Sequence, residues 1–222
     1  MNRWFMDNNE ESNCVEETFE VEPGQLTFSG DLGIGEVDLS CKGSSQASVR
    51  AVYNKNSPKI LFSHNHLKVS QLTKVSNPWK KDKHNWRVQL PKINPLVLKL
   101  NLGVGSSNID LTGVSLRKLK VSCGVGDLHL HLTNMKLTQD VPVKIDGGVG
   151  SQTITISEDL PALFKVNKGA GSFTGKGMVS LGASRYCTKS YQEGQPHFLI
   201  KLNVGVGDVA VIEEELVKSE NV

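Results

Sequence analysis

Hydrophobic and polar residues alternate along this chain in short segments, several of which contain a Gly-x-Gly unit. The clearest pair is NLGVGSSNIDLT at residues 101–112 and SCGVGDLHLHLT at residues 122–133, displaced by 21 positions. Alternation with a period of two indicates a β-strand with one buried face. Each segment therefore predicts one strand before the Gly-x-Gly unit and a second strand after it.

The Gly-x-Gly unit recurs at a step in the low twenties over much of the chain. Its first glycines are Gly33, Gly103, Gly124, Gly148, Gly169 and Gly205. Such a step is the length of one supersecondary unit, and repeats of this kind are typical of solenoids. The pattern predicts an all-β fold, a β-solenoid-like (β-helix-like) stack of turns of about 21 residues in which each turn rests on the one before it.

Alignment on the glycines produces columns of similar residues. Between the glycines stand Ile34, Val104, Val125, Val149, Ala170 and Val206, and stacking predicts that they form one row. Two residues before each first glycine stand Asp31, Asn101, Ser122, Asp146, Asn167 and Asn203. Small polar side chains stacked about 4.8 Å apart can hydrogen-bond from turn to turn. After the glycines the apolar phase shifts by one residue, which predicts a corner where glycine adopts a positive φ.

Two stretches interrupt the repeat and are predicted to be insertions. Residues 42–95 contain four strand-like runs, which we interpret as hairpins that extend the sheet. The runs are Ser48–Tyr53, Lys59–Ser63, Leu67–Leu72 and Trp86–Leu90. Residues 178–197 form a smaller insertion with a turn at Gly194-Gln-Pro196.

The domain organisation follows from the extent of the repeat. We predict a single β-solenoid-like domain over residues 21–213, which includes the insertion at 42–95. Residues 1–20 are acidic and are expected to be a flexible N-terminal segment, and residues 214–222 are expected to be a C-terminal tail.

Composition restricts the function classes. The formal net charge of +2 does not by itself indicate a nucleic-acid partner. The four cysteines include no C-x-x-C pair, so neither a zinc site nor a redox motif is suggested. No apolar run approaches the roughly 18 residues that cross a bilayer, and the first residues lack the apolar core of a signal peptide. We expect a protein kept in the cytosol or one from which a targeting segment has been removed.

Several ordered blocks together resemble a known family. They are WRVQLP at residue 86, LVLKLNLGVGSSNIDLTG at 96, LRKLKVSCGVGDLHLHL at 116, VKIDGGVGSQTITI at 143 and IKLNVGVGDV at 200. Over roughly residues 20–213 the chain resembles the toast-rack domain of bacterial cell-wall-active antibiotic response (Lia-type envelope-stress) proteins and of related adhesin-like proteins. The resemblance implies a stacked β-structure, no catalytic residues, and a membrane-associated or envelope location. The regulators of that family restrain a two-component system and have N-terminal membrane helices. Because no such segment stands in these 222 residues, we expect this chain to depart from them in that respect.

Motifs for catalysis and cofactors are incomplete. Residues 170–176 (AGSFTGK) approach a phosphate-binding loop, but Gly177 replaces the Ser or Thr that holds magnesium, and no helix follows. The dinucleotide fingerprint lacks its third glycine, and the calcium β-roll requires a nine-residue repeat. We therefore predict that the protein is not an enzyme and has no cofactor. A metal-dependent or carbohydrate-active enzyme is the less favoured alternative.

One set of polar residues could bind a metal. His129 and His131 lie on one strand face by alternation, with Asp110 one turn below. Two imidazoles and a carboxylate are suitable ligands for a transition metal. The other interpretation is an ordinary polar outer face, in which Asp110 and His131 hydrogen-bond between turns; we predict no metal site.

Basic residues concentrate in the first insertion. Between Asn54 and Lys99 there are ten Lys/Arg against one acid, Asp82. We predict an anion-binding site formed by Trp79, Lys80, Lys81, Lys83, Trp86 and Arg87. The alternative interpretations are that the lysines only protect a sheet edge from aggregation and that Trp86 has a buried packing role.

The resemblance thus implies a non-enzymatic interaction or regulatory module of the bacterial cell envelope, one that modulates a two-component stress response. The alternative is a surface or adhesin-like structural protein that binds anionic polymers or membrane headgroups through the basic patch. The expected partner is a protein or an anionic envelope or membrane component. No nucleic acid and no small-molecule substrate are expected, and self-association of the chain is left open.

Overall fold

The computed structural model describes residues 12–54, 56–71 and 84–215, and all regular elements in these ranges are strands. The strands form two layers, named here sheet A and sheet B, and β2 (Leu26–Lys42) runs from one into the other. In spatial order, sheet A consists of β1 (Asn13–Glu20), β3 (Gln46–Tyr53), β6 (His84–Pro91), the second half of β2, β8 (Ser107–Asp110), β10 (Leu128–Leu132), β12 (Gln152–Ser157), β18 (Val209–Glu214) and β14 (Phe173–Gly175).

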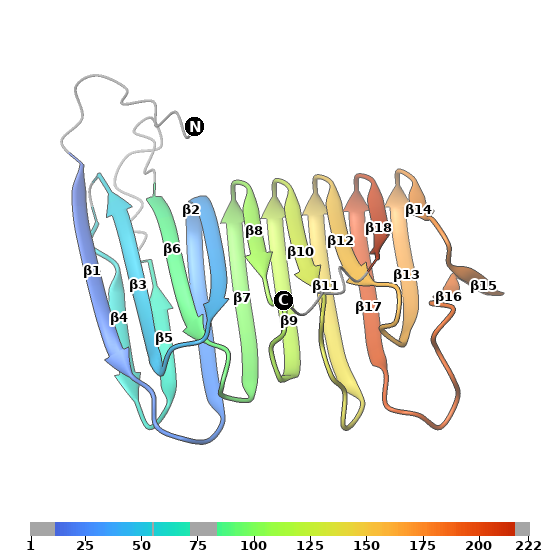
Figure 1. The fold of residues 1–222 in the computed structure, drawn as a ribbon. Coiled ribbons are helices and arrows are strands. Elements are labelled where there is room, and N and C mark those ends of the chain that lie inside the picture. The colour runs from blue at the N-terminus through green and yellow to red at the C-terminus, as the bar shows by residue number, and fades with distance from the viewer. Residues whose placement is uncertain (1–11, 55, 72–83, 216–222) are drawn as a thin grey trace.

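The strands of sheet B follow one another along the stack in the same direction as those of sheet A. In spatial order it consists of β4 (Lys59–Ser63), β5 (His66–Ser70), the first half of β2, β7 (Leu96–Val104), β9 (Leu116–Val125), β11 (Val141–Val149), β17 (Phe198–Val206), β13 (Ala162–Ala170), β16 (Arg185–Cys187) and β15 (Val179–Gly182). Each coil enters through a strand of sheet B, turns at its glycines and leaves through a strand of sheet A, so the coils stand side by side (Figure 1). The predicted all-β stack is confirmed.

The coils are stacked in register, as the sequence columns predicted. Val125 pairs with Val104 on one side and with Val149 on the other. Ile34 continues this row at one end and Val206 at the other. These side chains are about half exposed at the corner, so the row is a surface ridge and not part of the core.

The corners require glycine for two reasons. The second glycine of each unit has a positive φ, for example 137° at Gly126, which side chains rarely allow. A Cβ at Gly126 would also lie 2.0 Å from the carbonyl oxygen of Gly105 in the neighbouring coil. The first glycines are equally close to one another, since a Cβ at Gly124 would lie 2.4 Å from the oxygen of Gly103. Backbone therefore stacks directly on backbone at every corner.

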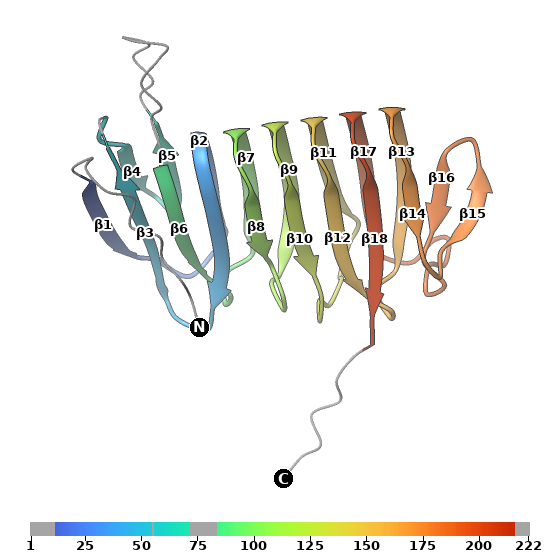
Figure 2. The same cartoon turned by 90° about the horizontal axis from the view of Figure 1, so that it is seen from above.

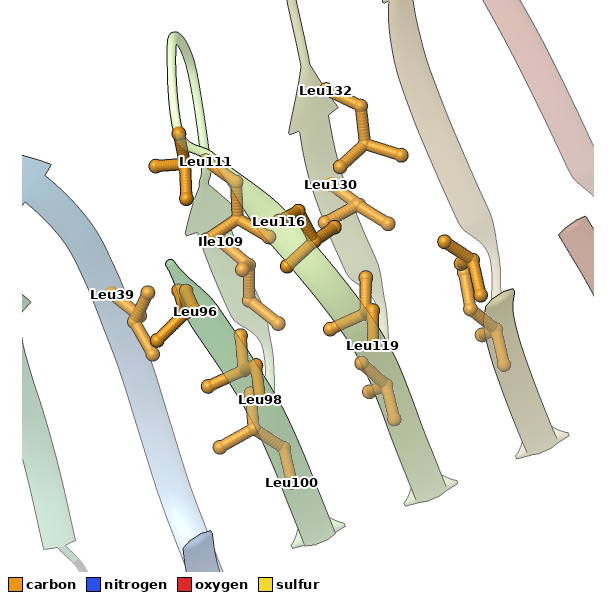
Figure 3. Packing of buried hydrophobic residues seen from close by; sticks show 14 of the residues in the cluster. Leu39, Leu96, Leu98, Leu100, Ile109, Leu111, Leu116, Leu119, Leu130 and Leu132 are labelled. Atoms are coloured by element: carbon orange, nitrogen blue, oxygen red, sulfur yellow. The ribbon is translucent and has the colours of Figure 1, made fainter. Parts of the chain in front are cut away.

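Aliphatic side chains fill the space between the two sheets. Period-two alternation turns Leu98 and Leu100 of β7 inward, where they meet Ile109 of β8. Leu119, Leu130 and other labelled residues continue this interior along the stack (Figure 3). Because each coil alone leaves one flank of its apolar residues uncovered, the neighbouring coils are needed to complete the core.

The last two coils do not follow the order of the chain. β17 pairs with β11 on one side and with β13 on the other, and β18 lies between β12 and β14 in the same way. The final coil is thus inserted between the two preceding ones (Figure 2). This corrects the expectation that each turn rests on the one before it. The long segment that contains β15 and β16 gives the chain enough length to return to this position.

Antiparallel strands extend both sheets at the N-terminal end. β4 and β5 form a hairpin, as predicted, whereas β3 and β6 pair although they are not consecutive in the chain. β5 pairs with β2 in sheet B and carries β4, whereas β6 pairs with β2 in sheet A and carries β3. One expectation is corrected here. Residues 13–20 are not a flexible end but form β1, which pairs with β3 along its whole length. Its alternating Val15, Glu17 and Phe19 are partly buried, which explains why this acidic segment joins the sheet.

Candidate binding face on sheet B

The outer face of sheet B carries a row of lysines that crosses the strands. β7, β9 and β11 contribute Lys99, Lys120 and Lys144, which pair in register with one another. β17 and β13 continue the row with Lys201 and Lys165. Beyond these strands, Lys68 lies at one end, separated from Lys99 by Ser29, and Arg185 lies at the other. All the cationic side chains of this lysine row are exposed.

Strand geometry explains why the lysines gather in one line. Parallel strands in register place equivalent residues about 4.8 Å apart, and alternation points them all to the solvent. Like charges on directly opposite positions repel and lower stability. One ion pair relieves this repulsion inside the row: Lys144 Nζ lies 2.7 Å from Asp146 Oδ2. The row therefore stores electrostatic repulsion that an anionic partner can offset.

A polar ladder runs beside the lysine row, where the sequence predicted turn-to-turn hydrogen bonds. Asn203 Nδ2 donates to Asp146 Oδ1 at 2.6 Å, and Asn167 Nδ2 donates to Asn203 Oδ1 at 2.8 Å. Asn101 donates in the same way to Asp31 in the first coils. The predicted ladder is thus confirmed at these positions.

The ladder and the lysines together control the charge of Asp146. Partial burial acts to raise its pKa, but hydrogen bonds from Lys144 and Asn203 and the positive charges of Lys144 and Lys120 outweigh this. The pKa of Asp146 is therefore below its ordinary value. Its carboxylate stays ionised and holds Lys144 in place.

A shallow groove of about 520 Å³ lies on the same face, over β9, β11, β17 and β13. Its lining includes the ladder residues Asp146, Asn203 and Asn167, together with the corner glycines Gly148, Gly205 and Gly169. The groove exists because the glycines have no side chains to fill it. Cys123 also lines the groove, but burial raises the pKa of its thiol to about 11. It is therefore protonated at neutral pH and is a poor nucleophile.

The residues predicted for anion binding have different positions. Trp79, Lys80, Lys81 and Lys83 lie outside the described residues, so that part of the site stays a prediction. Trp86 is 2% exposed and stacks on His84 inside the core, so it does not belong to a surface site. Alternation along β6 directs Trp86 inward with Val88.

Arg87 of the same strand is exposed on the outer face of sheet A. Its Nε lies 3.9 Å from Asp38 Oδ2. Arg87 thus lies on the opposite layer from the lysine row.

The possible metal ligands are on sheet A as well. His129 pairs with Asn108, and His131 pairs with Asp110. Asp110 Oδ1 accepts a hydrogen bond from the backbone N–H of Thr112. Within residues 12–54, 56–71 and 84–215, no group of three His, Cys, Asp or Glu residues is arranged to hold a metal ion.

Aspartates that follow the glycines have a structural role. Asp127 Oδ1 accepts a hydrogen bond from the backbone N–H of Ser151 in the next coil, at 2.9 Å. Asp208 binds both the N–H and the hydroxyl of Ser172, and these bonds lower its pKa. The segment that approached a phosphate-binding loop, residues 170–176, enters the short strand β14 and not a helix.

The lysine row was missed in the sequence, although its signal is present there. Four residues before each first glycine the column reads Ser29, Lys99, Lys120, Lys144, Lys165 and Lys201. The same alignment that revealed the apolar and polar columns contains it. A count of charge along contiguous segments, as for residues 54–99, conceals the row, because each repeat contributes only one lysine to it.

Comparison with known proteins identifies the family. The family described as the N-terminal domain of toast_rack, DUF2154, matches residues 7–155. A candidate cell adhesion protein from Clostridium sporogenes has the same fold, with a TM-score of 0.76 and 22% identity over 91% of this chain and 100% of its own. A candidate adhesin from Bacteroides fragilis matches 90% of this chain and 97% of its own at 16% identity, with a TM-score of 0.33. No curated protein matches the chain.

None of the described residues forms a helix that is long and apolar enough to cross a membrane. The family match covers more than half of the chain. This protein belongs to the toast_rack family.

Proposed function

We propose that this protein is a non-enzymatic, adhesin-like binding module of the bacterial cell envelope and that the outer face of sheet B is its contact surface. The observation that carries the proposal is the lysine row, in which like charges face each other across neighbouring strands. A sheet face needs only polar residues to stay soluble, so a row that lowers stability points to a partner. Family membership and the shared fold with a candidate adhesion protein support the envelope assignment.

A sedimentation experiment tests this function. Purified protein is mixed with isolated bacterial envelopes in about 0.05 M salt and then in about 1 M salt, where the Debye length falls to about 3 Å. We expect the protein to pellet at low salt, to be released at high salt and to liberate no soluble fragments. Protein that stays in the supernatant at low salt would reject the binding function, and fragment release would reject the non-enzymatic assignment.

Family membership supports a second candidate function. In this role the same module restrains a two-component system that responds to envelope stress, as the toast-rack regulators do. Deletion of the gene should then raise the output of an envelope-stress reporter in unstressed cells. Unchanged output in the deletion strain, with normal induction by a wall-active antibiotic, would exclude this role and leave the binding function standing.

A further inference from the structure

We propose that the lysine row binds a linear, phosphate-bearing polymer that lies across the strands, parallel to the stack. The proposal rests on the proposed function and names its ligand class. The backbones of neighbouring lysines are about 4.8 Å apart, and the lysines extend over β7, β9, β11, β17 and β13 in one line. A compact anion would reach only two or three of them. A chain of anionic groups can meet them all.

The groove beside the row supports the direction of the ligand. It crosses β9, β11, β17 and β13, as the row does, and does not follow any one strand. Its glycines are obligatory, since a Cβ at Gly148 would lie 2.3 Å from the oxygen of Gly124. The depression is therefore a fixed property of the stack. An elongated ligand can lie in it with the lysines along one side.

The residue type favours phosphate groups at variable spacing. Lysine presents a compact charge with three rotatable donors, and it binds phosphate as a point charge. Arginine would impose a planar geometry on each contact. The row contains a lysine on each of the sheet B strands β7, β9, β11, β17 and β13, and an arginine, Arg185, only at its end. A flexible polymer can adjust each phosphate to its nearest ammonium group.

The surroundings of the row disfavour nucleic acid and membranes. Binding of single-stranded nucleic acid relies on aromatic side chains that stack on the bases. In the described part of the face, the rows that border the lysines on β2, β7, β9, β11, β17 and β13 contain no aromatic ring. A bilayer presents its charge over a plane and would face Asp31 and Asp146 as well as the lysines, whereas a flexible polymer can turn its phosphates toward the lysines and away from Asp146.

Titration of the protein with fluorescent poly(glycerol phosphate) at several salt concentrations tests the proposal. Wild-type protein should bind at low salt, with an affinity that falls steeply as salt rises. The variant Lys99/Lys120/Lys201→Gln should bind about 100-fold more weakly, from about fivefold for each lysine. Its salt dependence should also decrease by about one ion for each lysine removed.

A matched variant separates the row from net charge. Lys42/Lys136/Lys176→Gln removes the same charge from exposed positions away from the lysine row, with Lys42 at the end of the sheet A half of β2, and it should change the affinity by less than about threefold. Circular dichroism and thermal unfolding of both variants check that the fold is intact. Equal loss of binding in the two variants would overturn the proposal.

Other outcomes would also overturn it. Tighter binding to a single-stranded oligonucleotide or to vesicles of anionic lipid than to the polymer would assign the row to those ligands. Absence of polymer binding, while wild-type protein still pellets with envelopes, would remove this inference and leave the proposed function. Absence of both would remove both.

Discussion

The outer faces of the two sheets have the same architecture but differ in charge: sheet A mixes acidic and basic residues, whereas sheet B carries a row of basic residues. On sheet A, one row runs through Glu16, Arg50, Arg87 and Asp38, and Arg50 Nε lies 3.9 Å from Glu16 Oε2. Acidic residues thus occupy both ends of this run and flank the two arginines, and the row continues through Asn108, His129, Thr153 and Ala210. The equivalent row on sheet B consists mostly of lysines.

This difference shows which positions the fold constrains. Inward side chains of both sheets share one core, so packing selects aliphatic residues on both. Outward side chains meet only solvent and one another, and either charge pattern is compatible with the stack. Sheet A also pairs two like charges, Arg50 and Arg87, but Glu16 and Asp38 flank them and offset the repulsion. Sheet B has a pattern that lowers stability, which is why we assign binding to it.

The largest predicted effect concerns the corner that holds the two faces in their orientations. Gly126→Ala should destabilise the protein by about 3 kcal/mol, because its φ of 137° is unfavourable and its Cβ would overlap the Gly105 backbone. Urea unfolding measures the loss. Gly43→Ala is the control, since a Cβ there would contact nothing. A loss below 1 kcal/mol for Gly126→Ala would contradict backbone stacking at the corner.

The polar ladder gives the next largest effect. Asn203→Ala removes the bonds that Asn203 makes with Asp146 and Asn167 and should cost about 1 kcal/mol. Asn108→Ala, at an exposed position of sheet A, should be close to neutral. Equal losses from the two variants in urea unfolding would show that the ladder does not stabilise sheet B.

The pH dependence of the ladder has a defined sign. Because the pKa of folded Asp146 lies below its ordinary value of 3.8, its stabilisation is present above the unfolded pKa and is lost as the pH falls through the folded pKa. The stability difference between wild type and Asn203→Ala should therefore shrink below about pH 4. Carboxyl titration by NMR should show the pKa of Asp146 rising in the variant. An unchanged pKa would separate the ladder from the charge of Asp146.

A smaller effect tests the repulsion within the lysine row. Lys201 lies between Lys144 and Lys165, so Lys201→Gln should stabilise the protein by a few tenths of a kcal/mol at low salt. The gain should disappear near 1 M salt, where exposed charges are screened. Thermal unfolding at the two salt concentrations measures it. Destabilisation at low salt would mean that the row does not store repulsion.

The smallest effect is expected on sheet A and has the opposite sign. Arg50→Gln removes a largely exposed ion pair with Glu16 and should cost no more than a few tenths of a kcal/mol at low salt. The same thermal unfolding series measures it beside Lys201→Gln. Stabilisation by both variants would remove the electrostatic contrast between the faces.

Much of the repeat could be predicted because its signals are local. The apolar columns became the core, the Asn and Asp column became the ladder, and the glycine columns became the corners. Each of these depends on residues close together in one coil and on the similarity between coils. The lysine column was equally readable, but it was missed because charge was counted along the chain and not across the repeat.

Other features had no local signal. The pattern of β1 resembles a solvated acidic segment, because half of its residues face outward, and only its pairing with β3 shows that it is a strand. Trp86 was placed in an anion site by its basic neighbours in the sequence. The register of β6 on β2 directs it into the core instead.

The sequence by itself determined the coil: its two strands, the glycine corner between them and the face to which each side chain points. These follow from a period of two, from the conformations available to glycine and from the need to bury aliphatic residues. Only the tertiary structure decided the order of the coils. Equivalent coils offer nearly the same edge to a neighbour, so β17 pairs as well with β11 as with β13. That order places Lys201 between Lys144 and Lys165. The lysine row itself does not depend on it, because each of these coils carries a lysine at the equivalent position.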